Sequence, residues 1–263
     1  MDISYILGVV VGLVFVLISI FLSGSVGNFL DPASVMIVIG GTIAAVIASY
    51  PLPMIMHQLK HLGIILKGNK FNPKPIIETL TEFAQEARKN GLLALEPKAN
   101  ELQDPFFRRA VMLIVDATEP DKVKEMLEGE IDSMAERHDA DAAIWEKAAG
   151  VCPAFGMIGT LVGLINMLMS MNLDSGSSSS LGTNMAVAMI TTFYGCLVAN
   201  LFLSPVANKL KLRNDEEILY REIIVEGVLG IQAGDNPKTL NEKLVACLST
   251  KDQNKLLDSG GGN

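Results

Sequence analysis

Four long stretches of this chain contain no charged residue, and they limit the folds that it can adopt. They are residues 3–30, 32–59, 148–173 and 175–208. Each is apolar and exceeds the roughly 20 helical residues that cross the hydrocarbon core of a bilayer. A water-soluble protein would not leave four such runs without charge. The pattern therefore predicts an all-α integral membrane protein with four transmembrane helices.

The basic residues predict how these helices are oriented. All 21 Lys and Arg residues lie within residues 60–147 or 209–255, and the short turns between paired runs contain none. The positive-inside rule places basic segments in the cytoplasm. We therefore expect the long loop, the tail and both termini to be cytoplasmic. The first run lacks the basic n-region of a secretory signal peptide, so we expect it to be a retained helix.

This topology divides the chain into four segments. Transmembrane helices one and two occupy residues 1–56, a cytoplasmic helical domain 57–147, transmembrane helices three and four 148–207, and cytoplasmic helices and tail 208–263. Apolar residues recur at helical spacing in the loop and the tail, so we expect both to form one helical domain. A helix that starts at Pro120 should continue into the third span, whereas residues 258–263 are expected to be disordered.

Composition and motifs exclude several classes of function. The net charge of −8 comes from interleaved acids and bases, so no basic stripe predicts a nucleic-acid partner. The chain has no HExxH motif, nucleophile elbow or phosphate-binding glycine loop, which predicts that it is not an enzyme. His57 and His61 stand one helical turn apart, but no third ligand accompanies them. We therefore expect no metal site and no cofactor.

Spans three and four each carry one face of small and weakly polar residues. In span three these are Pro153, Gly156, Thr160 and Gly163, and in span four Asn184, Ala188, Thr191, Gly195 and Ala199, with Thr192 beside Thr191. Such faces let helix backbones approach closely in lipid, so the simpler interpretation is packing between the two helices. The alternative is a groove that receives another helix, where hydroxyls and proline-freed carbonyls meet an ion.

The spans contain no Asp or Glu. Proton relays and cation pathways in membranes generally use an intramembrane carboxylate. If this chain conducts ions, the titrating group must come from another chain. The sequence therefore predicts an obligate partner with an intramembrane Asp or Glu.

Three segments resemble the MotA/PomA family of flagellar stator proteins. Residues 151–169 (VCPAFGMIGTLVGLINMLM) are similar to the family's third span, and residues 186–207, with ITTFYG and LSPVA, to its fourth. Residues 87–96 (ARKNGLLALE) resemble its rotor-facing segment. The order of spans, loop and tail matches over the whole chain. ExbB and TolQ share part of the PAFGMIGTLVG run but have three spans.

The resemblance implies a flagellar motor stator subunit in a bacterial plasma (inner) membrane. In the family, a homo-oligomeric ring surrounds the transmembrane helices of MotB, whose essential Asp supplies the acid that is missing here. The complex is an ion channel that converts ion flow into torque on the rotor for motility and chemotaxis. The alternative is an ExbB/TolQ-like proton channel subunit that energises an envelope complex, and a membrane scaffold without transport is more distant.

The resemblance also implies roles for individual positions. The ion pathway would include Thr160, Thr191, Thr192, Pro153 and Pro205; contacts with the rotor protein FliG would use Arg88, Lys89 and Glu96; and packing against the partner helix would use Gly156, Gly163, Ala188 and Gly195. Without the resemblance, the three charged residues would be interpreted as a solvated helix end.

The resemblance leaves two candidate ions. Thr160 stands where sodium-type PomA proteins have Thr and where many proton-type members have Ala. Some proton-type relatives carry Thr too, and the essential carboxylate belongs to the partner. We therefore expect H+ as the family default, with Na+ as the alternative.

Overall fold

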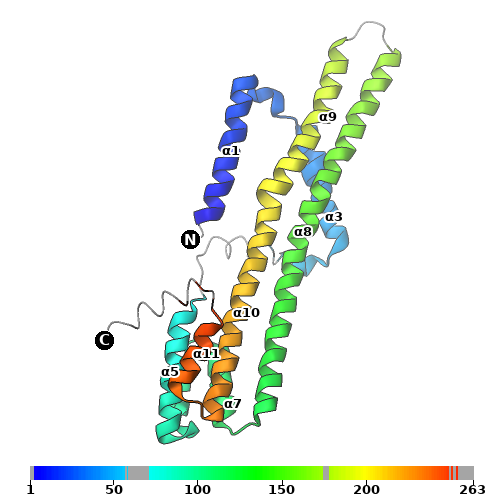
Figure 1. The fold of residues 1–263 in the computed structure, drawn as a ribbon. Helices are drawn as coiled ribbons and strands as arrows, with labels where there is room; N and C mark the ends of the chain where they lie inside the picture. The colour runs from blue at the N-terminus through cyan, green and yellow to red at the C-terminus, as the bar shows by residue number, and fades with distance from the viewer. Residues whose placement is uncertain are drawn as a thin grey trace. The chain divides into compact units, whose positions relative to one another are not determined.

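The computed structural model describes residues 3–56, 58, 71–173, 178–248, 250 and 253. Within these residues every regular element is helical, which confirms the all-α prediction (Figure 1). Four helical segments are long and apolar enough to cross a membrane: Ser4–Ser23, Val26–Ser49, Pro120–Met171 and Leu181–Ala233. Each contains most of one charge-free run. His57, His61 and residues 258–263, on which we made predictions above, lie outside the described residues.

The chain forms two compact units. One, which we call the span unit, comprises residues 1–68 and 138–212. The other, which we call the charged unit, comprises residues 69–137 and 213–263. Each unit thus combines segments that are far apart in the sequence.

The second span in the span unit is not one regular α-helix. After α1 (Ile3–Ser23) and the short 3-10 turn η1 (Val26–Phe29), the chain forms α2 (Pro32–Val35), the π-helical segment η2 (Met36–Gly40) and α3 (Gly41–Ser49). Asp31 caps α2, because its carboxylate accepts a hydrogen bond of 2.8 Å from the Ser34 amide. Tyr50 is extended and precedes Pro51, which ends α3.

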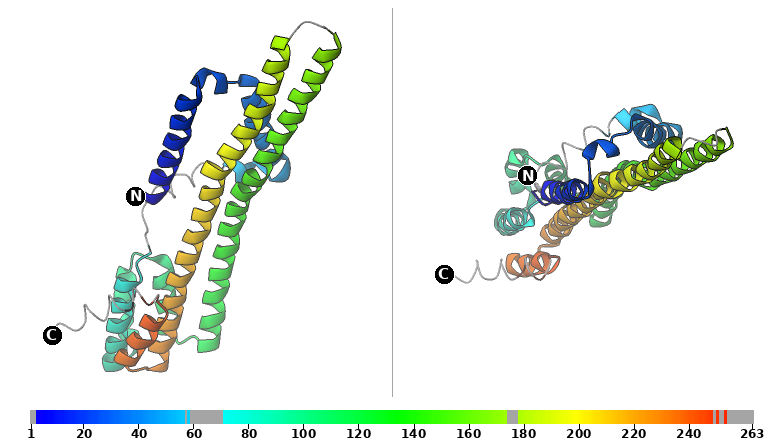
Figure 2. Two further views of the ribbon diagram at one scale, coloured as in Figure 1. Left: turned by 45° about the horizontal axis from the view of Figure 1, so that its top comes forward. Right: turned by 90° about the horizontal axis from the view of Figure 1, so that it is seen from above.

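Spans three and four are parts of much longer helices. α8 (Pro120–Leu173) is uninterrupted, which confirms that the helix from Pro120 continues into the third span. α9 (Ser178–Val198) passes through the π-helical segment η4 (Ala199–Leu203) into α10 (Ser204–Ala233). Figure 1 and Figure 2 show that α8 and α9 run side by side.

The charged unit has the apolar core of a soluble helical domain. Its helices are α5 (Pro73–Asn90), η3 (Leu92–Leu95), α6 (Glu96–Glu101), α7 (Pro105–Val115) and α11 (Pro237–Ala246), with parts of α8 and α10. Its fully buried side chains include Leu80, Leu127 and Ile223. This core joins loop and tail into one helical domain, as predicted.

Local sequence signals explain where these helices begin and end. Asn72, Asp104 and Asn236 each accept a hydrogen bond from a backbone amide two residues later, and each precedes a proline in the first turn. Gly91 and Gly234 adopt positive φ angles of 84° and 77° after the last turns of α5 and α10. Glycine adopts this conformation at no steric cost, so both positions stop a helix cleanly.

Candidate functional site

The backbones of α8 and α9 touch at Gly163. A β-carbon on this glycine would lie 2.8 Å from the Asn184 backbone oxygen and 2.9 Å from the Ala188 backbone nitrogen. Both distances are well inside van der Waals contact, so only glycine fits at this position. Close approach through small residues is the expected way for helices to associate in lipid.

The same contact continues along both helices. A β-carbon on Gly156 would lie 3.0 Å from the Thr191 backbone oxygen, and one on Gly195 would lie 3.0 Å from the Cys152 backbone oxygen. Gly159 was not singled out from the sequence. A β-carbon on it would lie 2.5 Å from Cγ2 of Thr191. We call these four positions, Gly156, Gly159, Gly163 and Gly195, the glycine seam.

The seam brings three threonine hydroxyls together. Thr160 Oγ1 lies 3.0 Å from the backbone oxygen of Ala188 on α9 and 3.1 Å from that of Gly156 on its own helix. It also shares a hydrogen bond with Thr192 Oγ1. Thr191 is fully buried, and its hydroxyl donates to Ala188 O at 2.9 Å. Thr160 and Thr192 remain partly exposed, whereas Thr191 serves the packing of the helices.

This hydroxyl cluster, formed by Thr160, Thr191, Thr192 and the backbone oxygens of Gly156 and Ala188, has more acceptors than donors. Each hydroxyl has one hydrogen and two lone pairs, and a carbonyl oxygen only accepts. Three O–H hydrogens therefore face five oxygen atoms. The spare lone pairs of the hydroxyl oxygens can accept a hydrogen bond from a protonated carboxylic acid or contact a small hard cation.

The two predicted pathway prolines occupy different places. The α-carbon of Pro153 lies 3.2 Å from the position of a β-carbon on Gly195, so this proline belongs to the seam. Pro205 lies in the first turn of α10, directly after η4. It follows Thr192 by thirteen residues, which is roughly 20 Å along a helix axis. Pro205 is therefore not part of the hydroxyl cluster.

Two π-helical segments, η2 of the second span and η4 of the fourth, pack beside the seam. Val38 of η2 packs in one cluster with Cys152 of α8 and Ala199 of η4. The Thr42 hydroxyl donates to Val38 O at 2.6 Å, which satisfies an oxygen near the irregular turn. π-Helical turns are rare and are frequently found at functional sites. The sequence does not predict them, because one extra residue in a helical turn hardly alters an apolar pattern.

The predicted rotor-facing residues lie on the surface of the charged unit. Arg88 and Lys89 occupy the last turn of α5, and Glu96 begins α6; all three are exposed. Basic residues at a helix C-terminus also interact favourably with the helix dipole. Between them Leu93 is 73% exposed, so an apolar side chain stands among the charges.

An ion pair links α5 to α6 across the segment that connects them. Lys98 Nζ lies 2.9 Å from Glu86 Oε2 and thereby joins α6 to α5. The Lys98 ammonium and then the Asn90 amide lower the pKa of the Glu86 carboxyl. The contribution of the ionised Glu86 carboxylate to the stability of the fold is therefore complete above the pKa of the unfolded carboxyl. It is lost as the pH falls through the lowered folded-state pKa.

The structure thus assembles most of the predicted pathway residues at the seam, apart from Pro205. The residues that the resemblance assigned to packing against the partner helix, Gly156, Gly163, Ala188 and Gly195, lie instead in the contact between α8 and α9. Arg88, Lys89 and Glu96 belong to the other unit. In the described part of the chain, no three His, Cys, Asp or Glu side chains gather in a way that could hold a metal ion.

Comparison with known proteins gives matches over the whole chain. Residues 6–91 match the motility protein A N-terminal family, and residues 98–223 match the MotA/TolQ/ExbB proton channel family. Motility protein A of Borreliella burgdorferi is 40% identical over 263 residues, covering 100% of both chains. Chemotaxis protein PomA of Vibrio alginolyticus is 37% identical, covering 93% of this chain and 94% of the relative.

Solved structures agree with these relatives. A chain of the flagellar MotAB stator complex from Bacillus subtilis superimposes with a TM-score of 0.87 at 30% identity, covering 95% of this chain and 98% of that one. A chain of C. jejuni MotAB gives the same TM-score at 28% identity. The family is one of motor and channel subunits, which confirms that this chain is not an enzyme. The full-length match at 40% identity, the two family matches and the shared fold together show that the chain belongs to the MotA/PomA family of motility proteins.

Proposed function

We propose that this chain is a stator subunit of the flagellar motor that forms a transmembrane ion channel with a MotB-type partner and converts ion flow into torque. The observation that carries the proposal is the hydroxyl cluster, which combines spare acceptors with spans that contain no acid. An ion path through such a seam needs a carboxylate from outside the chain. A partner helix with one Asp supplies it.

Ion flow through this arrangement releases enough energy to move a protein. Each charge that crosses 100 mV releases about 2.3 kcal/mol, several times the thermal energy. Protonation or ion binding at the partner's carboxylate changes whether the hydroxyls of Thr160 and Thr192 accept a hydrogen bond from it or donate one to it. Its packing against the seam therefore alternates as ions pass, and the subunits shift relative to the partner.

We further propose that identical subunits form a ring around the partner helices, with both termini in the cytoplasm. In the single chain, apolar residues on the membrane-spanning part of α8 remain more than half exposed, including Met157, Leu161 and Ile165. Exposed apolar surface of this kind is covered by lipid or protein. The confinement of all 21 basic residues to the loop and tail supports the orientation.

Swimming of a strain that depends on this chain and its partner tests the function and identifies the ion. We propose H+ as the ion, so swimming speed should be unchanged when sodium is replaced by potassium and should fall to zero with a protonophore. The oxygen cluster also suits Na+, which predicts the opposite pair of results. A strain that swims neither with sodium nor with potassium in the absence of the protonophore, although both proteins reach the membrane, would contradict the stator assignment.

The exposed charges Arg88, Lys89 and Glu96 are proposed to contact the rotor protein FliG. An exposed ion pair contributes roughly 0.2–1 kcal/mol, and a reversed charge adds a repulsion of similar size, so Arg88→Glu alone should weaken the contact by at most about thirtyfold. Adding Lys89→Glu should nearly stop swimming, and opposite charge reversals on the rotor should restore it. Glu125→Lys, an exposed reversal on α8, is the control and should swim normally. Failure of every rotor reversal to restore swimming would argue against this contact.

A further inference from the structure

The charges that flank the spans mark an inner boundary of the hydrocarbon core. Lys211 Nζ, after the fourth span, lies 2.6 Å from Glu146 Oε1, before the third. Lys209 is the first charged residue after the fourth span, and its Nζ lies 3.3 Å from Ser4 Oγ at the start of the first span. The ends of three spans therefore lie at one level, on the side that we propose to be cytoplasmic.

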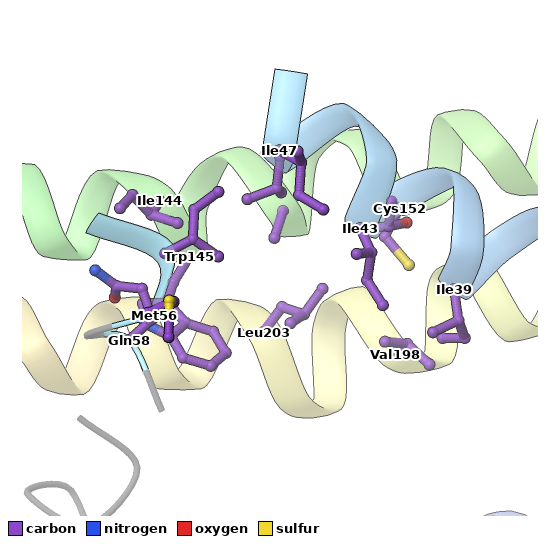
Figure 3. Close-up of a pocket in the computed structure, with 14 residues that line it drawn as sticks. Ile39, Ile43, Ile47, Met56, Gln58, Ile144, Trp145, Cys152, Val198 and Leu203 are labelled. Carbon is purple, nitrogen blue, oxygen red and sulfur yellow. The ribbon is translucent and has the colours of Figure 1, made fainter. Parts of the chain in front are cut away.

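The second span ends at the same boundary. Figure 3 shows Trp145 at the same end of an apolar pocket as Met56 and Gln58, which lie at the end of the second charge-free run. The Gln58 amide donates to Asp141 Oδ1 at 2.9 Å. Tryptophan is enriched at the interface between membrane and water. The indole and the amide therefore agree with the boundary that the charges mark.

The turn after the first span marks the outer boundary. The Phe29 ring lies against the Phe193 ring of α9, with the centroids 5.7 Å apart, and the Tyr194 hydroxyl donates to Phe29 O. Between the two boundaries, a β-carbon on Gly12 of α1 would lie 2.7 Å from Leu201 Cδ1, so α1 runs along η4. The 21 residues of α1 span roughly 30 Å, the thickness of a hydrocarbon core. Phe193 and Tyr194 are therefore level with the outer boundary.

The helices α8 and α9 continue beyond this boundary (Figure 1, Figure 2). α9 begins at Ser178, fifteen residues before Phe193, which is about 22 Å of helix. α1 is apolar throughout, and Leu7, Phe15 and Leu22 are 59%, 70% and 84% exposed, so the hydrocarbon core must extend over its whole length. A core about 30 Å thick cannot also cover the outer ends of α8 and α9.

An exposed amide agrees with this boundary. Asn166 is exposed on α8, twenty residues after Glu146, which is about 30 Å along the helix. An exposed amide within hydrocarbon would be costly. By contrast, Asn200 lies within the core, nine residues before Lys209, and its amide donates to Cys196 O at 2.9 Å. Asn166 therefore lies at the outer boundary.

The two boundaries determine the depth of the hydroxyl cluster. Thr160 follows Glu146 by fourteen residues, about 21 Å of helix. Thr192 precedes Lys209 by seventeen residues, about 26 Å. The core is about 30 Å thick. On both helices the cluster therefore lies in the outer third of the core.

We infer that an ion reaches the hydroxyl cluster from outside across less than about a third of the membrane potential, and that the rest drives the following step toward the cytoplasm. This rests on the ion path and the orientation proposed above. The outer ends of α8 and α9 stand beyond the core, where their apolar side chains contact neighbouring subunits of the proposed ring. External ions thus bind almost independently of voltage, whereas their release inward depends on it.

The voltage dependence of ion flux tests this depth. The full chain and its partner are reconstituted in liposomes, and flux is measured against the outer H+ concentration, and in a parallel series against Na+, at two potentials about 100 mV apart. One charge moved through this difference changes an equilibrium constant about fiftyfold, and through a third of it about fourfold. We expect the half-saturating outer concentration to change no more than about fourfold, with the remaining dependence in the saturated rate. A larger change in the half-saturating concentration would overturn the inference.

Chemical labelling measures the depth without any ion flux. Asn166→Cys should react with a membrane-impermeant maleimide added outside spheroplasts, and so should Met169→Cys, which is 61% exposed one turn farther out. Val14→Cys, 45% exposed in the middle of α1, is the control and should react only after the membrane is dissolved. The chain without these substitutions gives the background from its own cysteines. If neither outer variant is labelled in spheroplasts, although both react in denaturant, the inferred depth is wrong.

The two experiments separate this inference from the proposed function. Absence of flux from the complex, together with the expected labelling, would contradict the proposed function and not the depth of the cluster. Flux with a strongly voltage-dependent half-saturating concentration would contradict the depth and leave the proposed function intact.

Discussion

Replacing Gly163 with alanine should abolish torque while leaving the protein in the membrane. The new β-carbon would lie 2.8 Å from both the Asn184 backbone oxygen and the Ala188 β-carbon, and 2.9 Å from the Ala188 backbone nitrogen. Two of these atoms are backbone, so a side-chain rotation cannot remove the clash, and α8 and α9 must separate. Overpacking of this kind costs about 1–3 kcal/mol.

The separation also breaks the hydroxyl cluster. Thr160 Oγ1 is 3.0 Å from Ala188 O, and a displacement of about 1 Å takes this pair beyond hydrogen-bonding distance. Torque measured on tethered cells or swimming speed should therefore fall to the level of a strain without stators. Gly150→Ala is the matched control on the same helix, because nothing lies within 4 Å of its β-carbon position. Normal swimming of the Gly163 variant would show that the close approach of the helices is unnecessary.

Replacing Thr192 with valine should reduce torque about two- to twelvefold without changing the shape of the side chain. Valine keeps the branched volume but removes the hydroxyl that pairs with Thr160. The cluster loses one oxygen, and the energy of one buried hydrogen bond, about 0.5–1.5 kcal/mol, is lost from the path. Thr192→Ser retains the hydroxyl and should keep most of the torque.

Ser170→Ala is the control for loss of a hydroxyl in the same pair of helices. The Ser170 hydroxyl donates to Met167 O of its own helix at 2.8 Å and does not reach the cluster. This variant should swim normally, with membrane levels of all variants compared by immunoblot. Equal torque in the Thr192→Val and Ser170→Ala variants would remove the cluster from the mechanism.

Much of the fold follows from local signals in the sequence. The charge-free runs predicted four spans, and the helix from Pro120 was predicted to enter the third span, as α8 does. Periodicity and charge predict these features because both signals come from residues that are close together in the sequence. The π-helical segments Met36–Gly40 and Ala199–Leu203 were not predicted. Val38 and Ala199 of these segments pack against Cys152, in a cluster formed by three distant parts of the chain.

The candidate site was predictable in its composition and less so in its geometry. Small residues at three- and four-residue spacing predicted that the third and fourth spans approach closely, and Gly156, Gly163 and Gly195 do lie in the contact. Spacing does not distinguish Thr191 from Thr192, which are adjacent; the structure buries the first and leaves the second partly exposed. Roles that involve another protein, such as that of Arg88, depend on surfaces outside this chain.

In this mechanism the titrating carboxylate comes from the partner chain and faces the hydroxyl cluster, because the spans of this chain contain no Asp or Glu. Cation flux into liposomes, driven by an imposed membrane potential, tests it most directly. We expect no flux above background for the purified chain alone, measurable flux once the partner is incorporated, and none when the partner's intramembrane Asp is replaced by Ala. Selective flux through the chain alone would contradict the account.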